Sequence, residues 1–224
     1  MQIFKKILRL SLFSLPFLAF KQDKPMRVVF FGDSITQAAV NPGGYIDKMN
    51  KMLATAGKKD QYELIGAGVS GNKIYDLFLR IDDDVMAKQP NVVVVYVGVN
   101  DVWHKRLSGT GTDADKFVKF YDAILKKLAT NNIRAIVCTP AAIGEKTDHS
   151  NDQDGDLNQY SKLIREVAQR NGAAVCDLRQ LFLAYNLKNN PENKEANILT
   201  TDRVHLNQLG NQMVAESLYT LIVQ

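Results

Sequence analysis

The chain has 224 residues, of which 46% are hydrophobic and 23% are charged, and this composition is ordinary for a soluble globular protein. Its length allows one hydrophobic core of good size and favours a single domain after a short leader. The formal net charge is only +4, and no stretch gathers Lys and Arg with interleaved aromatic side chains. We therefore expect no nucleic-acid partner.

Residues 1–22 are predicted to be an export signal. Lys5, Lys6 and Arg9 precede a largely apolar run over residues 10–20, which suits a signal-peptide core and is too short to span a bilayer as a helix. An ordinary amphipathic helix is the alternative. Ala19 is small, as a cleavage site requires, but Phe17 is not, so the cleavage point is not readable. We expect a secreted or periplasmic protein with no stable membrane span after removal of the leader.

Three segments are nearly unbroken runs of apolar residues, and they are predicted to be buried strands: 27–31, 91–97 and 134–138. They do not alternate with polar residues, so both faces must be covered, as in a parallel sheet between layers of helices. Two weaker strands are predicted over 62–65 and 173–176.

Between these strands, apolar residues recur at helical spacing and predict five helices, over 45–56, 72–88, 113–131, 157–170 and 208–223. Strands and helices thus alternate five times, which predicts a doubly wound α/β sandwich with right-handed crossovers. Ligands of such folds bind beyond the carboxyl ends of the strands, so the residues that follow each strand are the first candidates for a site.

The residues at these strand ends are of the types that acyl transfer requires. Ser34 follows the first strand in a Gly-Asp-Ser turn, Gly71 follows the second strand, and Asn100 follows the third. Asp202 and His205 form an Asp-x-x-His pair before the last helix. A Gly-Asp-Ser tripeptide alone arises by chance in ~3% of chains of this length, so the joint appearance carries the prediction. Together these residues offer a nucleophile, a base, a residue that orients the base, and oxyanion donors.

Segments 32–36, 68–72, 98–101 and 202–207 resemble the conserved blocks of the SGNH (GDSL) hydrolase family, the GDSL-like lipases and acylhydrolases. Their spacing covers essentially all of residues 23–224, which we expect to form one domain. The resemblance implies a flavodoxin-like three-layer α/β/α sandwich with a five-stranded parallel sheet in the order 2-1-3-4-5. One departure is Gly66, where the family often has an asparagine after the second strand. We expect this change to alter packing and not chemistry.

The resemblance also implies roles for individual residues. Ser34 is the expected nucleophile, and Asp202 and His205 complete the triad. The main-chain N–H groups of Ser34 and Gly71 and the side-chain amide of Asn100 are the expected oxyanion hole. Physical reasoning agrees, because Asp202 can accept a hydrogen bond from Nδ1–H of His205 and leave Nε2 facing the serine. Neither a cofactor nor a metal belongs to this mechanism.

Trp103 and His104, expected on a loop after the third strand, are candidate substrate-binding residues. Core packing of Trp103 and a plain surface role for His104 are the alternatives. The acidic segment 144–156 is expected to be a solvated loop, since it lacks the bidentate glutamate of a calcium loop. Cys138 and Cys176 are expected to be buried free thiols, with a disulfide as the alternative.

We expect a carboxylic ester hydrolase acting on a short acyl group, most simply acetate, carried by a sugar-like alcohol. The segments expected to rim the site, 104–113 and 144–156, are polar, with Leu107 as their one large aliphatic residue. A long acyl chain needs an apolar trench, because each buried CH₂ contributes ~0.8 kcal/mol. The alternatives are a lysophospholipase or thioesterase, acyl transfer to an alcohol, and a non-catalytic glycan-binding module. The sequence does not indicate an oligomeric state.

Overall fold

The computed structural model describes residues 24–223, so the predicted export signal, residues 1–22, lies outside the described residues. Five parallel strands form one sheet in the order β2-β1-β3-β4-β5. They are β1 (Met26–Gly32), β2 (Tyr62–Gly68), β3 (Val92–Tyr96), β4 (Arg134–Cys138) and β5 (Ala174–Cys176). The predicted strand order is confirmed. Every residue of β3 is buried, as its unbroken valine run predicts.

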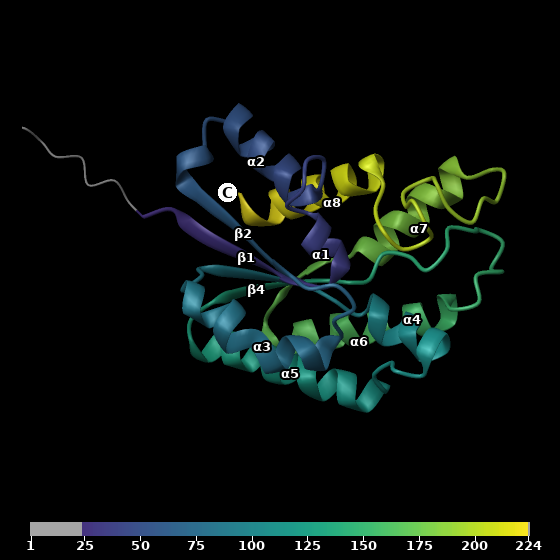
Figure 1. Cartoon of the computed structure of the whole chain (residues 1–224), viewed down its shortest axis with the longest axis horizontal. Coiled ribbons are helices and arrows are strands. Elements are labelled where there is room, and N and C mark those ends of the chain that lie inside the picture. The colour runs from purple at the N-terminus through teal and green to yellow at the C-terminus, as the bar shows by residue number, and fades with distance from the viewer. Residues whose placement is uncertain (1–23, 224) are drawn as a thin grey trace, which may run out of the picture.

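Helices cover both faces of the sheet and give the predicted three layers (Figure 1). One layer holds α2 (Tyr45–Thr55) and α8 (Gln208–Ile222), with α1 (Ser34–Ala38) and α7 (Leu178–Asn189) on the same side. The other layer holds α3 (Ile74–Asp84), α5 (Ala114–Thr130) and α6 (Asp154–Asn171), with α4 (Val99–Ser108) beyond their ends. Two short 3₁₀ turns, η1 (Lys59–Gln61) and η2 (Met86–Lys88), complete the described elements. None of the helices between residues 24 and 223 is long and apolar enough to cross a membrane.

Three of these helices, α1, α4 and α7, do not follow from the sequence pattern. In α4 only the first four residues are buried, so the helix shows no apolar stripe and 104–108 were wrongly expected to be loop. In α7 the leucines do not share one buried face, and Leu187 is 62% exposed. Both helices are therefore fixed by tertiary contacts more than by local periodicity.

The expectation of a solvated loop over 144–156 holds for residues 148–150 and 152, which are irregular and exposed, but not for the whole segment. Glu145, Asn151 and Gln153 are buried, and residues 154–156 form the first turn of α6. Gly66 lies within β2, not after it. A Cβ added to Gly66 would lie 2.5 Å from Cγ1 of Val40, so this glycine allows the segment after α1 to approach the strand closely.

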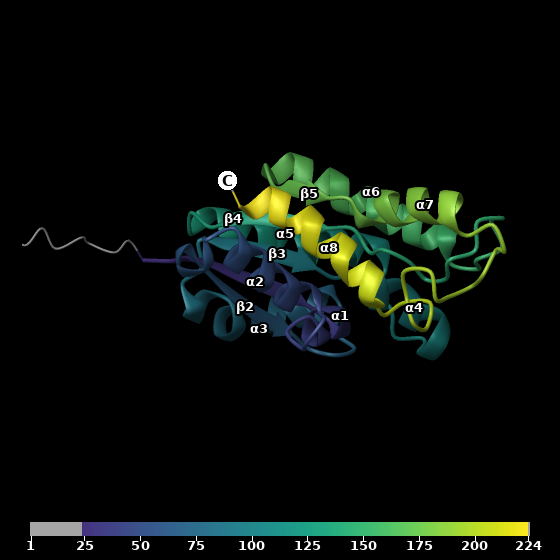
Figure 2. The same ribbon diagram turned by 90° about the horizontal axis from the view of Figure 1, so that it is seen from above.

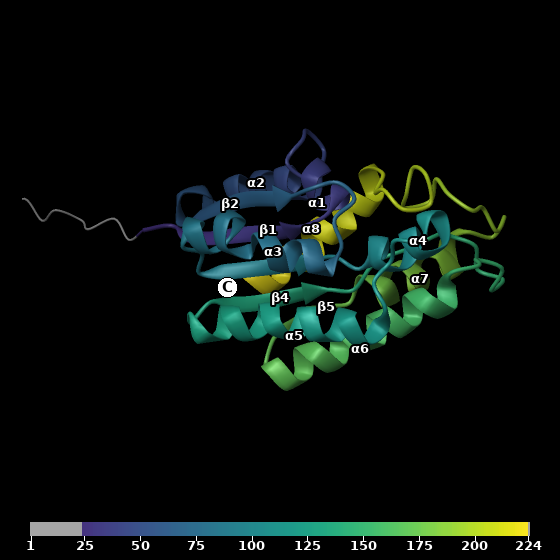
Figure 3. The same cartoon turned by 60° about the horizontal axis from the view of Figure 1, so that its bottom comes forward.

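Cys138 and Cys176 are direct register partners at the carboxyl ends of β4 and β5. Both are buried and both are free thiols, as expected. At this same edge of the sheet lie the two long irregular segments of the described chain, 139–153 and 190–207 (Figure 2). Figure 3 shows the same arrangement from another side, with the N-terminal end of α8 close to α1.

Candidate active site

Ser34 lies where β1 meets the sheet edge and the chain turns into α1. Asp33 caps this helix, because its Oδ1 accepts a hydrogen bond from the N–H of Ile35 at 3.0 Å. The turn requires Gly32, since a Cβ there would lie 2.3 Å from Oγ1 of Thr36 and 2.4 Å from the carbonyl oxygen of Tyr96. The sequence Gly-Asp-Ser therefore places a serine hydroxyl at the carboxyl edge of the sheet, next to the central strand.

A continuous chain of hydrogen bonds joins Ser34 to His205 and Asp202. Oγ of Ser34 lies 3.0 Å from Nε2 of His205, and Nδ1 of the same ring lies 2.6 Å from Oδ2 of Asp202. The other carboxyl oxygen, Oδ1, accepts hydrogen bonds from the N–H groups of Val204 and His205, at 3.1 and 2.7 Å. The structure thus brings together three residues that the sequence separates by up to 171 positions.

The charge state of Asp202 sets the direction of these bonds. Partial burial alone would raise the pKa of Asp202, but hydrogen bonds from the main chain and ring of His205 lower it below the ordinary value. An ionised carboxylate can only accept, so Nδ1 of His205 carries the proton and Nε2 is free to accept from the serine hydroxyl. This is the arrangement in which an imidazole can act as a base toward Ser34.

The predicted oxyanion donors Gly71 and Asn100 lie on the segments that follow β2 and β3, at the same edge of the sheet as Ser34. Asn100, in the first turn of α4, is buried, and its amide donates one hydrogen bond to the carbonyl of Asn72 at 3.1 Å. Gly71 has φ +77°, and the turn around it is held by the N–H of Ser70, which donates to Oε1 of Gln37 at 2.9 Å. Within residues 24–223, the N–H groups of Ser34 and Gly71 have no protein acceptor. They remain available to a ligand.

Two further acids lie buried behind this edge. Asp101 accepts hydrogen bonds from the N–H of Ile74 at 3.2 and 3.3 Å and so ties α4 to the start of α3. Burial raises the pKa of Asp101 to about 7, and burial also raises the pKa of Asp33 to about 7. Asp33 thus supports the turn into α1, and Asp101 connects α4 to the start of α3.

Trp103 lies beside the serine–histidine pair, on a helix and not on the expected loop. Its ring centroid is 6.4 Å from that of His205, with the planes at 72°. A hollow of about 290 Å³ opens next to it, lined by Trp103, Arg106, Leu107, Asp152, Gln153 and Arg203. His104 is partly buried and adjacent to Trp103 but does not line this hollow. Burial, with the nearby charge of Lys73, lowers the pKa of His104 below the ordinary value of 6.5.

A second hollow, of about 410 Å³, lies toward α1 and the start of α8. Side-chain amides are common in its lining, which consists of Ala38, Asn41, Pro42, Gly43, Gly44, Thr201, Leu206, Asn207, Gln208 and Asn211. Arg203, which precedes His205, lines the first hollow, and Leu206, which follows it, lines the second. The hollow at Trp103 is therefore lined mainly by polar residues, while the hollow toward α1 has a mixed lining of amide and apolar side chains.

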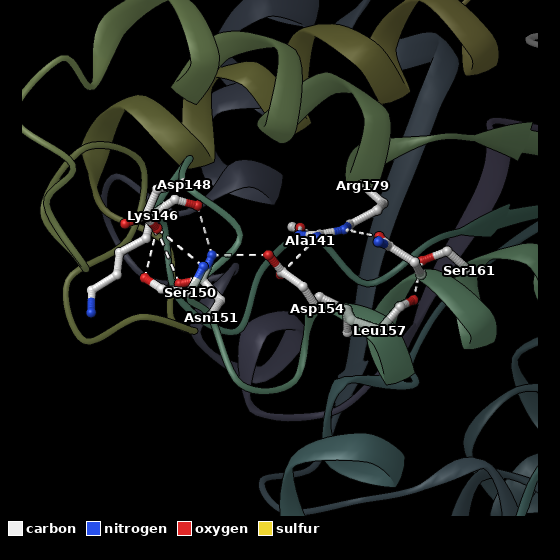
Figure 4. A network of polar contacts seen from close by, with 10 residues as sticks. Ala141, Lys146, Asp148, Ser150, Asn151, Asp154, Leu157, Ser161 and Arg179 are labelled. Carbon is white, nitrogen blue, oxygen red and sulfur yellow. Dashed lines mark hydrogen bonds and ion pairs between the residues drawn. The ribbon is translucent and has the colours of Figure 1, made fainter.

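A network of buried polar side chains, which the sequence did not reveal, holds the segment 139–153 in place (Figure 4). Arg179, at the start of α7, is only 5% exposed and donates to Oδ1 of Asp154 at 2.7 Å. Oδ2 of the same carboxyl accepts from the amide of Asn151 at 3.0 Å, and this amide also donates to the carbonyl of Lys146. Successive residues of this network are separated by at most 25 positions along the chain, but they form no recognisable sequence motif.

Residues 30–213 match the model of the GDSL-like Lipase/Acylhydrolase family. Among curated proteins, an acetylxylan esterase from Geobacillus stearothermophilus is 24% identical over 209 residues, covering 85% of this chain and 91% of that protein. The crystal structure of an acetyl xylan esterase, AlAXEase, is similar with a TM-score of 0.87 and 63% identity, covering 88% of this chain and 100% of that one. The structure of LAE5, an alpha/beta hydrolase from the metagenome of Lake Arreo in Spain, has a TM-score of 0.77 and 26% identity, with 87% and 94% covered.

Proposed function

Since the chain belongs to the GDSL-like lipase/acylhydrolase family and is a carboxylic ester hydrolase, we propose that it removes acetyl groups from acetylated carbohydrate, with acetylxylan as the model substrate. The observation that carries the proposal is the chain of hydrogen bonds from Ser34 through His205 to Asp202, beside the polar hollow at Trp103. The 63% identity to an acetyl xylan esterase over 88% of the chain supports the choice of acyl group and alcohol.

In the proposed reaction, Oγ of Ser34 attacks the acetyl carbonyl while Nε2 of His205 takes the hydroxyl proton. The resulting oxyanion accepts hydrogen bonds from the N–H groups of Ser34 and Gly71 and from the Asn100 amide. The C–O bond to the sugar then breaks, and His205 returns its proton to the departing alkoxide. Water, activated by the same ring, next attacks the acetyl-enzyme and releases acetate, which regenerates Ser34.

The solved variants of the Geobacillus stearothermophilus acetylxylan esterase support these roles. Three of them are described as catalytic mutants, and they carry alanine in place of a serine, an aspartate and a histidine. In that enzyme the aspartate and the histidine are three positions apart, as are Asp202 and His205 here.

The surroundings of the serine favour a small acyl group on a polar alcohol. Of the six residues that line the hollow beside His205, Trp103 and Leu107 are the only apolar ones. An aromatic face suits the C–H-rich face of a sugar ring, and the indole N–H has no protein acceptor within residues 24–223, so it is free to meet a hydroxyl. In this hollow a long acyl chain would leave most of its CH₂ groups against polar side chains, where burial contributes little.

The test is acetate release from acetylated xylan, compared with a series of p-nitrophenyl esters from acetyl to palmitoyl. We expect acetate release, the highest kcat/KM for acetyl esters, and loss of nearly all activity in Ser34→Ala with the fold retained. A fluorophosphonate is expected to label Ser34. Preference for octanoyl or longer esters, without acetate release from any glycan, would favour a lysophospholipase or thioesterase instead. Binding of xylan without turnover would favour a glycan-binding module, and acetyl transfer to an added alcohol in preference to water would favour a transferase.

We also propose that the protein is exported, because polymeric glycans lie outside the cytoplasm and residues 5–20 have the charge and hydropathy pattern of a signal peptide. Mass spectrometry of the N-terminus of the protein recovered from its native host tests this. An intact Met1 in cytoplasmic protein would contradict export.

A further inference from the structure

The segment that carries Asp202 and His205 has little regular structure of its own. Residues 190–207 form neither a helix nor a strand, and one isolated bridge pairs Thr200 with Leu206. Arg203, between the two residues of the dyad, has φ +85°, a left-handed conformation that is unfavourable for a residue with a side chain. Such a conformation persists where the surrounding contacts fix it.

The main contact comes from Glu145, in the segment after β4. Its side chain is 1% exposed and accepts three main-chain hydrogen bonds from the dyad segment. Oε1 accepts from the N–H groups of Leu199 and Thr200, at 2.6 and 2.9 Å, and Oε2 accepts from the N–H of Ile198 at 2.9 Å. Three consecutive N–H groups just before Asp202 are thus held by one buried carboxyl group.

The neighbouring glycine holds the dyad segment after Asp202. The N–H of Gly144 donates to the carbonyl of Arg203 at 2.9 Å, while the N–H of Arg203 donates to Oγ1 of Thr200 at 3.2 Å. Gly144 itself has φ +94°, and a Cβ there would lie 2.4 Å from Oδ1 of Asn151. Glu145 therefore binds the backbone before Asp202, and Gly144 binds the left-handed residue Arg203 directly after it.

Residues 144 and 145 are in turn held by hydrogen bonds and packing contacts to other parts of the fold. Asn151, which packs against Gly144, is bound to Asp154, and Asp154 is bound to the buried guanidinium of Arg179 on α7 (Figure 4). On the other side, the amide of Asn190 donates to the carbonyl of Glu145 at 2.9 Å. A displacement of the Glu145 side chain would therefore move the backbone of residues 198–203 first and leave the hydrophobic core in place.

We propose that Glu145 is a positioning residue for the catalytic dyad, which acts by fixing the backbone at 198–203 so that Asp202 aligns His205 on Ser34. The inference rests on the proposed roles of these three residues. A glutamine at position 145 would keep one oxygen for Leu199 and Thr200 but turn an NH₂ group toward the N–H of Ile198. Two donors would then face each other in a buried site, and the dyad segment would move.

The first measurement is the kinetics of Glu145→Gln with p-nitrophenyl acetate, at a temperature well below the melting temperatures of both proteins. We expect kcat to fall at least 10-fold with KM within 2-fold of wild type, because alignment of the dyad matters in the transition state and not for binding so small a substrate. Asp122→Asn is the matched control. The carboxyl group of Asp122 on α5 also interacts with several donors, Arg170, Asn171 and Lys126, at the end of α6 that precedes β5. We expect this variant to lose stability with kcat within 2-fold of wild type.

The second measurement is a double-mutant cycle with Asp202→Asn, which separates positioning from general loss of structure. If Glu145 acts through the dyad, Glu145→Gln is expected to lower kcat less than 3-fold in the Asp202→Asn background. An unchanged kcat in Glu145→Gln, an equal loss in Asp122→Asn, or a full 10-fold loss in both backgrounds would overturn the inference. Near-wild-type kcat in Asp202→Asn alone would instead overturn the proposed function. If Glu145→Gln fails to fold, Glu145→Asp takes its place in the cycle, since it keeps both oxygens but shortens the reach by one methylene.

Discussion

Asp101 is a buried acid whose folded-state pKa of about 7 lies above the ordinary value of 3.8 because burial disfavours its charge. The folded state therefore holds a proton that the unfolded state releases near pH 4. Because the folded state binds more protons, the free energy of unfolding falls as the pH rises from about 4 to 7, and the contribution of Asp101 is lost completely above pH 7. Asp101→Asn keeps an acceptor for the N–H of Ile74 and removes this titration.

The free energy of unfolding of the wild type is expected to fall between pH 5 and pH 8. We expect the fall in Asp101→Asn to be smaller than the fall in the wild type by about 2–3 kcal/mol. Urea unfolding at the two pH values measures it. The control is Asp83→Asn, on the exposed face of α3, which is expected to keep the wild-type dependence on pH. Equal dependence in Asp101→Asn and wild type would show that Asp101 does not titrate in this range.

Gly71 offers a second test at the scale of one residue. Its φ is +77°, and a Cβ added there would meet no heavy atom within 4 Å, so Gly71→Ala introduces backbone strain without a clash. We expect a loss of about 1–2 kcal/mol in the free energy of unfolding. We also expect a clear fall in kcat, since the strain moves an N–H group proposed to bind the oxyanion.

Gly57, at the end of α2, is the matched control for Gly71, because it has φ +66° and equally open surroundings. Gly57→Ala is expected to cost similar stability with no change in kcat. If both variants keep wild-type kcat, the N–H of Gly71 is not an oxyanion donor. Both free energies come from urea unfolding, and both rates from p-nitrophenyl acetate.

At this scale, the sequence predicted the residues that lie in local motifs and missed those that do not. Ser34 and the Asp202–His205 pair stand in short patterns directly at element boundaries, and the structure brings them within hydrogen-bonding distance. Glu145 was taken for part of a solvated acidic loop, because its three donors lie 53 to 55 positions away and are main-chain groups that no side-chain pattern reveals. Arg179 was missed because its partner Asp154 lies 25 positions away and the two residues form no local motif.

At the scale of elements, α4 links two parts of the site that the sequence placed separately. Asn100 and Trp103 are three positions apart on this helix, so their side chains lie on neighbouring positions of one face. Apolar periodicity could not predict the helix, because after Val102 it carries mostly polar residues. The helix places the backbone of Trp103 so that its ring lies beside His205.

We therefore expect Trp103→Ala to lower kcat/KM for acetylated xylooligosaccharides at least 10-fold, because the sugar loses its packing surface, and to change kcat/KM for p-nitrophenyl acetate much less. The ratio of the two values is the measurement. Leu107→Ala is the control, since Leu107 lines the same hollow but is 66% exposed. Equal losses on both substrates would indicate that Trp103 supports His205 and not the sugar.

At the scale of the whole molecule, periodicity predicted the strands, while their order came only from the family resemblance. Unbroken apolar runs show that a strand is covered on both faces, but they do not say which strands are neighbours. The register explains why β1 and β3 are so uniformly apolar: β1 pairs with both β2 and β3, and β3 with both β1 and β4, so each lies inside the sheet. The edge strand β2 is only partly buried, and its pattern was accordingly weaker.

This architecture makes a prediction about cooperativity. The buried apolar residues of both helical layers and all five strands form one contiguous cluster, which favours a single unfolding transition for residues 24–223. Trp103 is the one tryptophan in the sequence and is partly buried beside His205, where it packs against the edge of the core. Its fluorescence therefore reports on the site edge, while far-UV circular dichroism reports on all helices.

Because Arg179 and Glu145 tie the site segments to α7 and to the chain after β4, we expect the site edge to unfold together with the core. Urea transitions followed by tryptophan fluorescence and by circular dichroism are then expected to coincide, with the same midpoint and the same slope. In Glu145→Gln the fluorescence midpoint is expected to move below the circular dichroism midpoint, since the tie is weakened while the core is intact. Separate transitions in the wild type would mean that the site edge opens on its own, and that its alignment depends on bound substrate more than on the buried polar network.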